Sequence, residues 1–337
     1  MNILFTCAGR RNYLINFFKD ELKGEGLVIA ADMQMTAPAM ASADRRIIVP
    51  PVYAPNYIKT LLEICRTHEV GAVVSLNDLE LPILAENKEL FDAVGSKVIV
   101  ASSEAIDIAF DKKRTVEFAT ALGIESPLTF TCIDDAIQAI QSGELHFPLV
   151  VKPRWGSASI GLEFPTNLTE LELAFRLLSL RLGRTMLAEA SQSDFDHAIL
   201  IQEKIEGIEF GVDVLNDFNG CTRQVYVKEK LAMRAGETDK SVLRNQPEIE
   251  NLGHKIGNAL KHIGNLDCDV FEKDGRLYLL ELNPRFGGGY PFTHMSGGNY
   301  VAAILSFLRG EEYDFGTFQR RYDVVFSKCD NLMQVSE

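Results

Sequence analysis

The residues with the clearest potential for chemistry lie between 266 and 289, in the stretch LDCDVFEKDGRLYLLELNPRFGGG. Asp269 lies in its first half, and Glu281 and Asn283 lie in its second half. Carboxylate and amide oxygens are ligands that Mg²⁺ prefers, usually together with the phosphates of a substrate. Arg285 follows two residues later, and its planar fork of donors suits a phosphate or a carboxylate. The stretch therefore predicts a site for a divalent cation beside an anion.

The geometry of this stretch depends on its turn. Apolar and β-branched residues flank Lys273-Asp274-Gly275, which predicts a β-hairpin. A two-residue Asp-Gly turn would place Asp269 and Glu281 on opposite faces. A three-residue loop, with Gly275 in the left-handed conformation, would place on one face the odd-numbered residues, Asp267, Asp269, Leu277, Leu279, Glu281 and Asn283. We favour the three-residue loop because it brings the oxygen ligands together, although an ordinary acidic surface hairpin would have the same composition.

A second candidate site begins at Lys152, near the end of the apolar segment FPLVVKP (147–153). A lysine in such a strand is costly to bury unless it has an anionic partner. The loop that follows contains Gly156, Ser157 and Gly161, and small residues let successive backbone N–H groups approach a phosphate. The loop lacks the Gly-Lys-Ser/Thr of a Walker A motif. An ordinary surface loop is the alternative interpretation.

Further charged candidates lie between these two stretches. Glu203 and Glu209 belong to the expected strands ILIQEKI and EFGVDVL, where they also fit the solvated side of an antiparallel sheet. The polar segment 233–246 is expected to be a mobile loop over the site. From it, Lys240 and Arg244 are candidates to bind an acyl phosphate or an acidic substrate, with simple solvation as the alternative.

The elements that position these residues begin with a regular alternation. Amphipathic segments separate short apolar segments at 2–7, 27–32, 71–76 and 97–100. This β-α-β pattern predicts a parallel, doubly wound sheet. The first loop, from Cys7 to Asn12, has only one glycine of the G-x-G-x-x-G pattern, although Asp32 lies at about the spacing of a ribose-binding acid. Arg10 and Arg11, near a helix N-terminus, suit an anion or solvent equally. A Rossmann-like scaffold without a dinucleotide is the favoured interpretation.

Composition limits the possible partners. The chain has 337 residues, 46% hydrophobic and 24% charged, which suggests two or three globular domains or subdomains. Its net charge of −13 argues against nucleic acid as a partner, because phosphate binding needs a basic surface. We expect neither a membrane span nor a signal peptide. The six cysteines are scattered without a C-x-x-C pair, so free thiols in the cytoplasm are expected.

The segment LLELNPRFGGGYPFTH (279–294) resembles the C-terminal motif of the ATP-grasp ligases, a family that includes the carbamoyl-phosphate synthase large chain and biotin carboxylase. In that family the Glu and Asn of E-x-N-P-R hold Mg²⁺, and the Arg faces the transferring phosphate. The resemblance assigns these roles to Glu281, Asn283 and Arg285. It assigns the upstream metal ligand to Asp269.

The resemblance extends over nearly the whole chain. The nucleotide contacts that it implies are with the phosphates, the purine and the ribose, made by Lys112, Lys152, Gly156, Ser157, Gly161, Glu203, Lys204, Ile205 and Glu209. Lys112 lies in the helix expected at 110–124, where residue pattern alone would make it a surface lysine. Arg285, Lys240 and Arg244 are the candidate catalytic cations.

The implied fold class is α/β, becoming α+β in the C-terminal part. A Rossmann-like pre-ATP-grasp domain is expected at 1–107, and a two-subdomain ATP-grasp fold follows. The small subdomain with its phosphate-loop lid is expected at 108–200, and the large subdomain with the Mg/ATP site at 201–337. The chain has room for one ATP-grasp unit of the kind that is duplicated in carbamoyl-phosphate synthase, and it shows no internal repeat.

The implied function is ATP-dependent ligation of a carboxylate to an amine or ammonia through an acyl phosphate, with Mg²⁺ or Mn²⁺. The expected partners are small-molecule substrates, with a homodimer left open. One alternative is a non-catalytic ATP-binding subunit, perhaps half of a split carbamoyl-phosphate synthase. The other is a Rossmann oxidoreductase, which the degenerate first loop disfavours.

Overall fold

The computed structural model describes residues 1–156, 161–185 and 187–335. Its N-terminal sheet has the strand order β3-β2-β1-β4-β5, and neighbouring strands are parallel. These strands are β1 (Asn2–Thr6), β2 (Val28–Asp32), β3 (Arg45–Ile48), β4 (Val70–Ser75) and β5 (Lys97–Val98). The accompanying helices are α1 (Asn12–Leu22), α2 (Pro38–Ser42), α3 (Tyr57–Thr67), α4 (Leu81–Glu86) and α5 (Lys88–Asp92). The helical segment between β4 and β5 is interrupted at Asn87, which ends α4 and precedes α5.

Alternate residues of these strands enter two separate hydrophobic clusters. Leu4 of β1 packs in one cluster with Leu61 of α3, whereas Phe5 packs in the other with Leu14 of α1. Two apolar faces on one parallel sheet require helices on both sides. The predicted doubly wound sheet is therefore confirmed.

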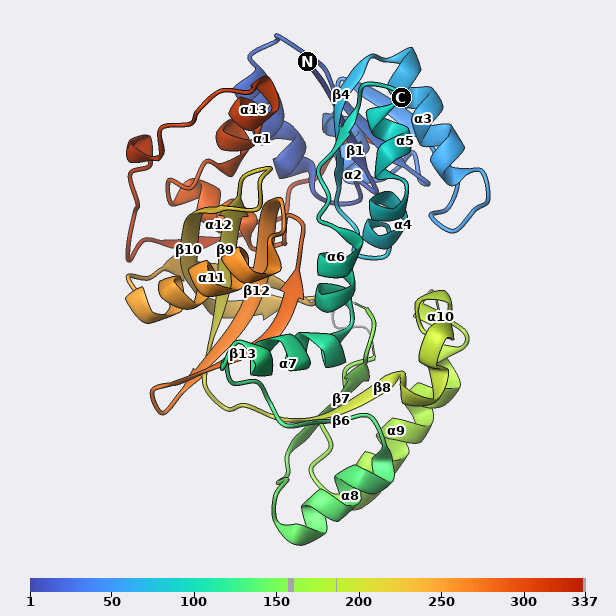
Figure 1. Cartoon of the computed structure of the whole chain (residues 1–337), viewed down its shortest axis with the longest axis vertical. Helices are drawn as coiled ribbons and strands as arrows, with labels where there is room; N and C mark the ends of the chain where they lie inside the picture. The colour runs from blue at the N-terminus through green and yellow to red at the C-terminus, as the bar shows by residue number, and fades with distance from the viewer. Residues whose placement is uncertain (157–160, 186, 336–337) are drawn as a thin grey trace.

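A small antiparallel sheet, in the order β6-β8-β7, forms a separate unit at the bottom of Figure 1. Its strands are β6 (Thr129–Phe130), β7 (Leu149–Pro153) and β8 (Ile199–Glu203). Its helices are α8 (Ile133–Ser142), α9 (Leu168–Leu182) and α10 (Leu187–Ala190). A hydrophobic cluster joins α8 and α9 to β7 and β8. No helix in the described ranges is long and apolar enough to cross a membrane.

The C-terminal part is an antiparallel sheet in the order β13-β12-β9-β10-β11-β14. Its strands are β9 (Ile208–Asn216), β10 (Thr222–Arg234), β11 (Glu237–Leu243), β12 (Gly264–Lys273), β13 (Arg276–Asn283) and β14 (Val325–Ser327). The helices around it are α6 (Ser103–Phe110), α7 (Lys112–Ala121), α11 (Pro247–Leu260), α12 (Tyr290–Met295) and α13 (Tyr300–Arg309). The observed architecture is the mixed α/β fold that the sequence predicts.

The two faces of this large sheet differ in chemistry. Valines of β9 and β10 pack against α11, and Gly253 of α11 allows the close approach, because a Cβ there would lie 2.7 Å from Val225. On the opposite face the same strands carry Asp213, Lys228 and Lys230. Because side chains alternate along a strand, one face forms a core while the other is available for charged groups.

The turn of the β12–β13 hairpin differs from our prediction. Lys273 pairs with Arg276, so the loop has two residues, Asp274 and Gly275, both with positive φ. Asp269 nevertheless lies opposite Glu281, because Leu280 is left without a partner in a β-bulge. Asp267 and Asn283 pair in the same way. The metal-ligand candidates therefore share a face, but for a different physical reason.

The bulge also corrects the rest of the predicted face. Leu279 pairs with Val270 and Leu277 with Glu272, so both leucines point away from Asp269. Leu279 is buried in the core on the α11 side, and Leu277 packs against that core. Their assignment to the face of the acids was wrong, because the predicted three-residue loop does not form.

The segment 233–246 is not a loop. Arg234 pairs with Glu237 across a two-residue turn at Ala235 and Gly236, and β10 and β11 form a long hairpin. Strand β14 pairs with β11 and completes the sheet.

Candidate active site

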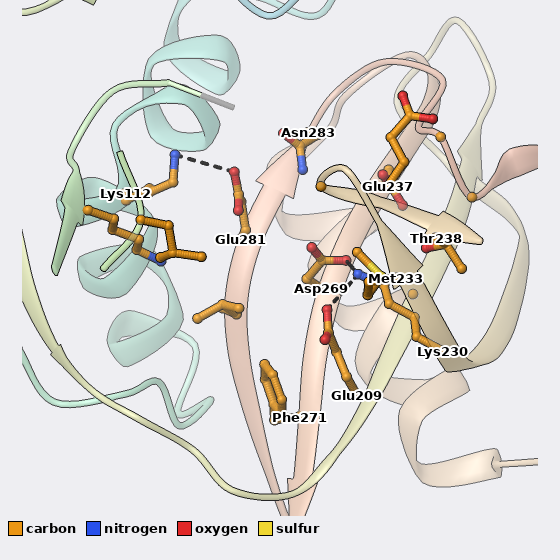
Figure 2. Close-up of a pocket in the computed structure, with 18 of the residues that line it drawn as sticks. Lys112, Glu209, Lys230, Met233, Glu237, Thr238, Asp269, Phe271, Glu281 and Asn283 are labelled. Carbon is orange, nitrogen blue, oxygen red and sulfur yellow. Dashed lines mark hydrogen bonds and ion pairs between the residues drawn. The ribbon is translucent and has the colours of Figure 1, made fainter. Parts of the chain in front are cut away.

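A cavity of about 580 Å³ is lined by side chains of the small and large antiparallel sheets and by residues that follow β1 and β4 of the N-terminal sheet. Figure 2 shows part of its wall. Ligand pockets in proteins typically have volumes of about 300–1,000 Å³, so a nucleotide-sized molecule fits. The hairpin β12–β13 contributes Asp269, Glu281 and Asn283, and Arg285 follows it. The structure thus brings these four predicted site residues into one cavity.

Lys112 is the first residue of α7, and its position is fixed by the cap of that helix. The Asp111 side chain accepts a hydrogen bond from the backbone N–H of Lys113, which caps the helix. Arg154 holds the same carboxylate through two hydrogen bonds of 2.7 and 2.6 Å. The Lys112 ammonium then lies 2.5 Å from the carbonyl oxygen of Gly156 and 3.3 Å from Glu281. Contrary to residue pattern alone, Lys112 is buried and faces the cavity.

Lys152, at the end of β7, is also buried and lines the cavity. Burial lowers the pKa of Lys152 to about 8, which the Glu281 carboxylate opposes and the Lys112 ammonium reinforces. Two buried ammonium groups side by side are unfavourable without an anion between them. Their arrangement suits a polyphosphate.

The candidate metal ligands already have cations beside them. Asp269 accepts a hydrogen bond of 2.6 Å from Lys230, and Glu281 lies 3.3 Å from Lys112. The described ranges contain no group of three or more His, Cys, Asp and Glu side chains placed to hold a metal. Mg²⁺ commonly uses one or two carboxylates and completes its coordination with water and substrate phosphates. The oxygen donors of Asp269, Glu281 and Asn283 fit that mode of binding.

Lys230 was not predicted as a site residue. Its ammonium lies between Glu209 and Asp269, 2.6 Å from each carboxylate (Figure 2). Burial lowers the pKa of Lys230, but the two carboxylates outweigh burial and raise it above its ordinary value. Lys228 and Lys230 alternate in β10 with the apolar Val225 and Val227, so the sequence could have indicated that both lysines share one face of that strand.

Arg285 lies at the end of the cavity nearest the N-terminal sheet. Its guanidinium is 2.7 Å from Asp78, which follows β4, and 4.0 Å from Asp267. Burial raises the pKa of Asp267 to about 7, and the neighbouring Asp269 and Asp213 add to this effect. Arg11 lines the same end and donates hydrogen bonds to the carbonyl oxygens of Leu76 and Phe286. Of the two arginines of the first loop, Arg11 therefore faces the cavity.

The opposite end of the cavity is more apolar. Glu203, Lys204 and Ile205 line it, as do the side chains of Phe164, Phe271 and Leu280. Gly156 lines it too, but Gly161 lies beside α9, where a Cβ would come within 2.7 Å of Leu178. Ser157 lies outside the described residues. The positions predicted to contact a purine thus lie together, at the end of the cavity away from Arg285.

Two predicted catalytic cations lie elsewhere. Lys240 is exposed on β11, opposite Ser327 of β14. Arg244 makes ion pairs of 2.7 Å with Glu229 and Asp323. Glu229 alternates with the cavity-facing Lys228 and Lys230, so Arg244 is on the far side of the sheet. The expectation that these residues reach the site from a mobile loop was wrong, because the segment is a hairpin.

The first loop of the N-terminal sheet is occupied by its own contacts. The Asp32 carboxylate accepts hydrogen bonds of 2.9 Å from the backbone N–H groups of Gly9 and Gln34. These hydrogen bonds fix the loop that follows β1 and use both oxygens of Asp32. The spacing of Asp32 from the first loop is therefore no evidence for a dinucleotide site.

Models of two protein families match separate parts of the chain. Residues 145–293 match the model of the ATP-grasp domain, and residues 3–99 match the PylC-like N-terminal domain. The chain thus joins a PylC-like N-terminal domain to an ATP-grasp domain, and it is homologous to carbamoyl phosphate synthase large chains.

The carbamoyl phosphate synthase large chain of Methanosphaerula palustris is 24% identical over 275 residues, which are 75% of this chain and 24% of that protein. The chain therefore spans about a quarter of the length of such relatives. The biotin carboxylase domain of Hydrogenobacter thermophilus 2-oxoglutarate carboxylase, solved with MgADP, ADP and bicarbonate, superposes with a TM-score of 0.72 at 17% identity, covering 96% of this chain and 73% of that one. The L-amino acid ligase from Bacillus licheniformis superposes with a TM-score of 0.69 at 18% sequence identity, covering 91% of this chain and 75% of that one.

Proposed function

We propose that this chain is an ATP-dependent ligase that joins a carboxylate to an amine or ammonia through an acyl phosphate. The observation that carries the proposal is the convergence of Lys112, Lys152 and the hairpin acids on one cavity. Phosphate-binding cations beside oxygen ligands for Mg²⁺ are the arrangement that phosphoryl transfer from a nucleoside triphosphate uses. The related solved structure with MgADP and bicarbonate supports the same chemistry.

The proposed reaction has two steps. A carboxylate oxygen of the substrate attacks the γ-phosphorus of ATP, and the bond to the bridging oxygen of ADP breaks. The nitrogen of the amine then attacks the carbonyl carbon of the acyl phosphate, phosphate leaves, and the nitrogen loses a proton. Neither step requires a covalent bond to the protein, so catalysis consists of positioning and of neutralising charge.

Side chains of the cavity divide this work. Lys112 and Lys152 hold the phosphates, and Arg285 neutralises the transferring group at the other end. Asp269, Glu281 and Asn283 would hold Mg²⁺, or Mn²⁺, which supplies further charge neutralisation on the phosphates. Glu209 binds the ribose, and the segment from Glu203 to Ile205 reads the purine, as the resemblance implies. The carboxylate and amine enter at the Arg11 end, where the N-terminal sheet contributes to the wall.

The test is substrate-dependent release of ADP. The chain with Mg²⁺ and ATP is incubated with a panel of amino acids and dipeptides, each with and without ammonia. A ligase releases ADP and phosphate in equal amounts with a new C–N product, detected by mass spectrometry. Binding of ATP without ADP release for any pair would contradict the proposal.

One alternative has its own support, because the chain spans only about a quarter of the carbamoyl phosphate synthase large chains. It could be the ATP-binding part of a split synthase, active only with a second subunit. The paired metal-ligand positions favour a catalytic role. An oxidoreductase has no comparable support, since the first loop is held closed by Asp32. We further propose a cytoplasmic location, a division at 1–107, 108–200 and 201–337, and a homodimer as the assembly to test.

A further inference from the structure

The cluster of Lys230, Glu209 and Asp269 joins two parts of the cavity that have different tasks. Lys230 is on β10, Glu209 on β9 and Asp269 on β12, and β9 lies between the other two strands. The lysine side chain is only 8% exposed, and its ammonium is 2.6 Å from both carboxylates. Both acids line the cavity (Figure 2). One buried cation thus holds together two side chains that come from different strands.

A glycine makes this reach possible. Gly211 of β9 pairs with Lys228 on one side and with Asp269 on the other. A Cβ at Gly211 would lie 3.3 Å from Cε of Lys230 and 3.6 Å from Cε of Lys228. Lys230 therefore crosses β9 over a position without a side chain. A side chain at this position would crowd the Cε atom of Lys230, which would have to shift by a few tenths of an ångström.

Lys228, two residues earlier on the same strand, provides the contrast. It is 2% exposed and forms an ion pair with Asp213 and a hydrogen bond of 2.9 Å with Thr293. Asp213 is fully buried in the interior of the protein. Lys228 also lines the cavity, but its partners Asp213 and Thr293 do not, and the Lys228 cluster ties β9 and β10 to α12. In the Lys230 cluster both acids, Glu209 and Asp269, line the cavity. Lys230 can therefore influence ligand binding through these acids, besides neutralising their charge.

We propose that Lys230 is a positioning residue that couples the ribose site to the metal site, by holding Glu209 and Asp269 through one ammonium. The inference rests on the proposed function, because that function assigns the ribose to Glu209 and the metal to Asp269. A fixed carboxylate loses less freedom when it binds a ligand, so preorganisation improves affinity. Removing Lys230 releases both acids and leaves their mutual repulsion uncompensated.

The test uses equilibrium binding of a non-hydrolysable ATP analogue, which needs no turnover. Two ratios are measured: the affinity with and without Mg²⁺, and the preference for the ribonucleotide over its 2′,3′-dideoxy form. Glu209→Gln is expected to reduce only the ribose preference, and Asp269→Asn only the Mg²⁺ effect. Lys230→Met is expected to reduce both ratios, by about tenfold each, the effect of about 1.4 kcal/mol. Lys230→Arg should recover part of both.

Controls separate positioning from other roles. Lys228→Met removes an equally buried lysine whose ionic partner, Asp213, does not line the cavity, so it should lower the melting temperature and change both ratios less than Lys230→Met does. Gly211→Ala keeps the lysine but crowds it, so it should move both ratios in the direction of Lys230→Met, to a smaller extent. If Lys230→Met does not fold, Gly211→Ala and Lys230→Arg decide the question.

Two results would overturn the inference. Nucleotide binding that weakens equally for all analogues, with both ratios intact, would make Lys230 a direct phosphate ligand. Ratios that change no more than those of Lys228→Met would make it a structural ion pair. Failure of the unaltered chain to bind the analogue with Mg²⁺ would instead contradict the proposed function itself.

Discussion

On the side of the large sheet that α11 covers, β9, β10 and β12 present Val212, Val225 and Cys268, each at most 1% exposed. On the other side the same three strands present Asp213, Lys230 and Asp269. The first face is stabilised by removing apolar surface from water. The second places charges where they are poorly hydrated, at a cost that is offset by pairing each lysine with a carboxylate. The alternation of side chains along the strands therefore separates the residues that stabilise the fold from the residues that could do chemistry. The separation runs through one sheet and does not follow a domain boundary.

The largest effect on stability is expected from Leu279→Ala, which removes a buried side chain from the apolar face of the sheet. Leu279 is 1% exposed and packs in the core with Val270. Its truncation should lower the free energy of unfolding by about 2–5 kcal/mol. Urea denaturation measures the change. Nucleotide affinity of the folded variant should stay close to that of the parent, and a large loss would show that the two faces are not independent.

Glu281→Gln changes the charged face of the sheet, which lines the cavity. The variant keeps the shape of the side chain but removes a charge that faces Lys112 and the proposed metal. Turnover should fall by about 10²–10³-fold, as for other lost electrostatic partners. The denaturation midpoint should change little, since the side chain is one-fifth exposed and does not belong to the core. A folded variant that ligates at the parental rate would rule out the metal-site interpretation.

A dependence of nucleotide binding on pH is expected from Lys152, a buried cation that lines the cavity. Burial lowers the pKa of Lys152 to about 8, and bound phosphates should raise it again. Above pH 8 the free lysine is largely neutral, so nucleotide binding takes up a proton and affinity falls as pH rises, by up to about tenfold per unit. Below pH 8 Lys152 is already protonated in the free protein, so its titration should no longer change the affinity for the nucleotide. Calorimetry in two buffers measures the proton uptake, and Lys152→Met should abolish it.

The smallest effect is expected for Arg244→Met, on the far side of the sheet from the cavity. Arg244 is about one-third exposed and pairs with Glu229 and Asp323 near the surface. Exposed ion pairs contribute about 0–1 kcal/mol, so the melting temperature and the rate should both remain near parental values. Loss of activity by an order of magnitude would restore Arg244 as a catalytic cation.

Sequence reasoning was most reliable where the signal is local. The order of strands and helices and the strand that ends near Lys152 follow from nearby residues. The E-x-N-P-R motif locates Glu281, Asn283 and Arg285 because their spacing is fixed within one strand and its exit. These features could be predicted from the chain alone.

What could not be predicted depends on contacts between distant segments. Lys230 becomes a site residue only when β9 lies between β10 and β12, and Asp78 only when the N-terminal sheet meets Arg285. Polar composition at 233–246 was interpreted as a loop, but strand pairing with β14 outweighs that local preference. Lys240 and Arg244 were misplaced for the same reason.

The bulge at Leu280 has a consequence for comparing this chain with its relatives. In a regular strand only every second residue faces a given side, but here the consecutive residues Leu280 and Glu281 both line the cavity. A relative that lacks one residue at this point would still place its glutamate opposite the acid of the neighbouring strand, in an uninterrupted ladder. It would lose only the extra apolar side chain. A one-residue gap in an alignment here would therefore mark a change in the shape of the ligand pocket, while the metal-binding acids stay in register.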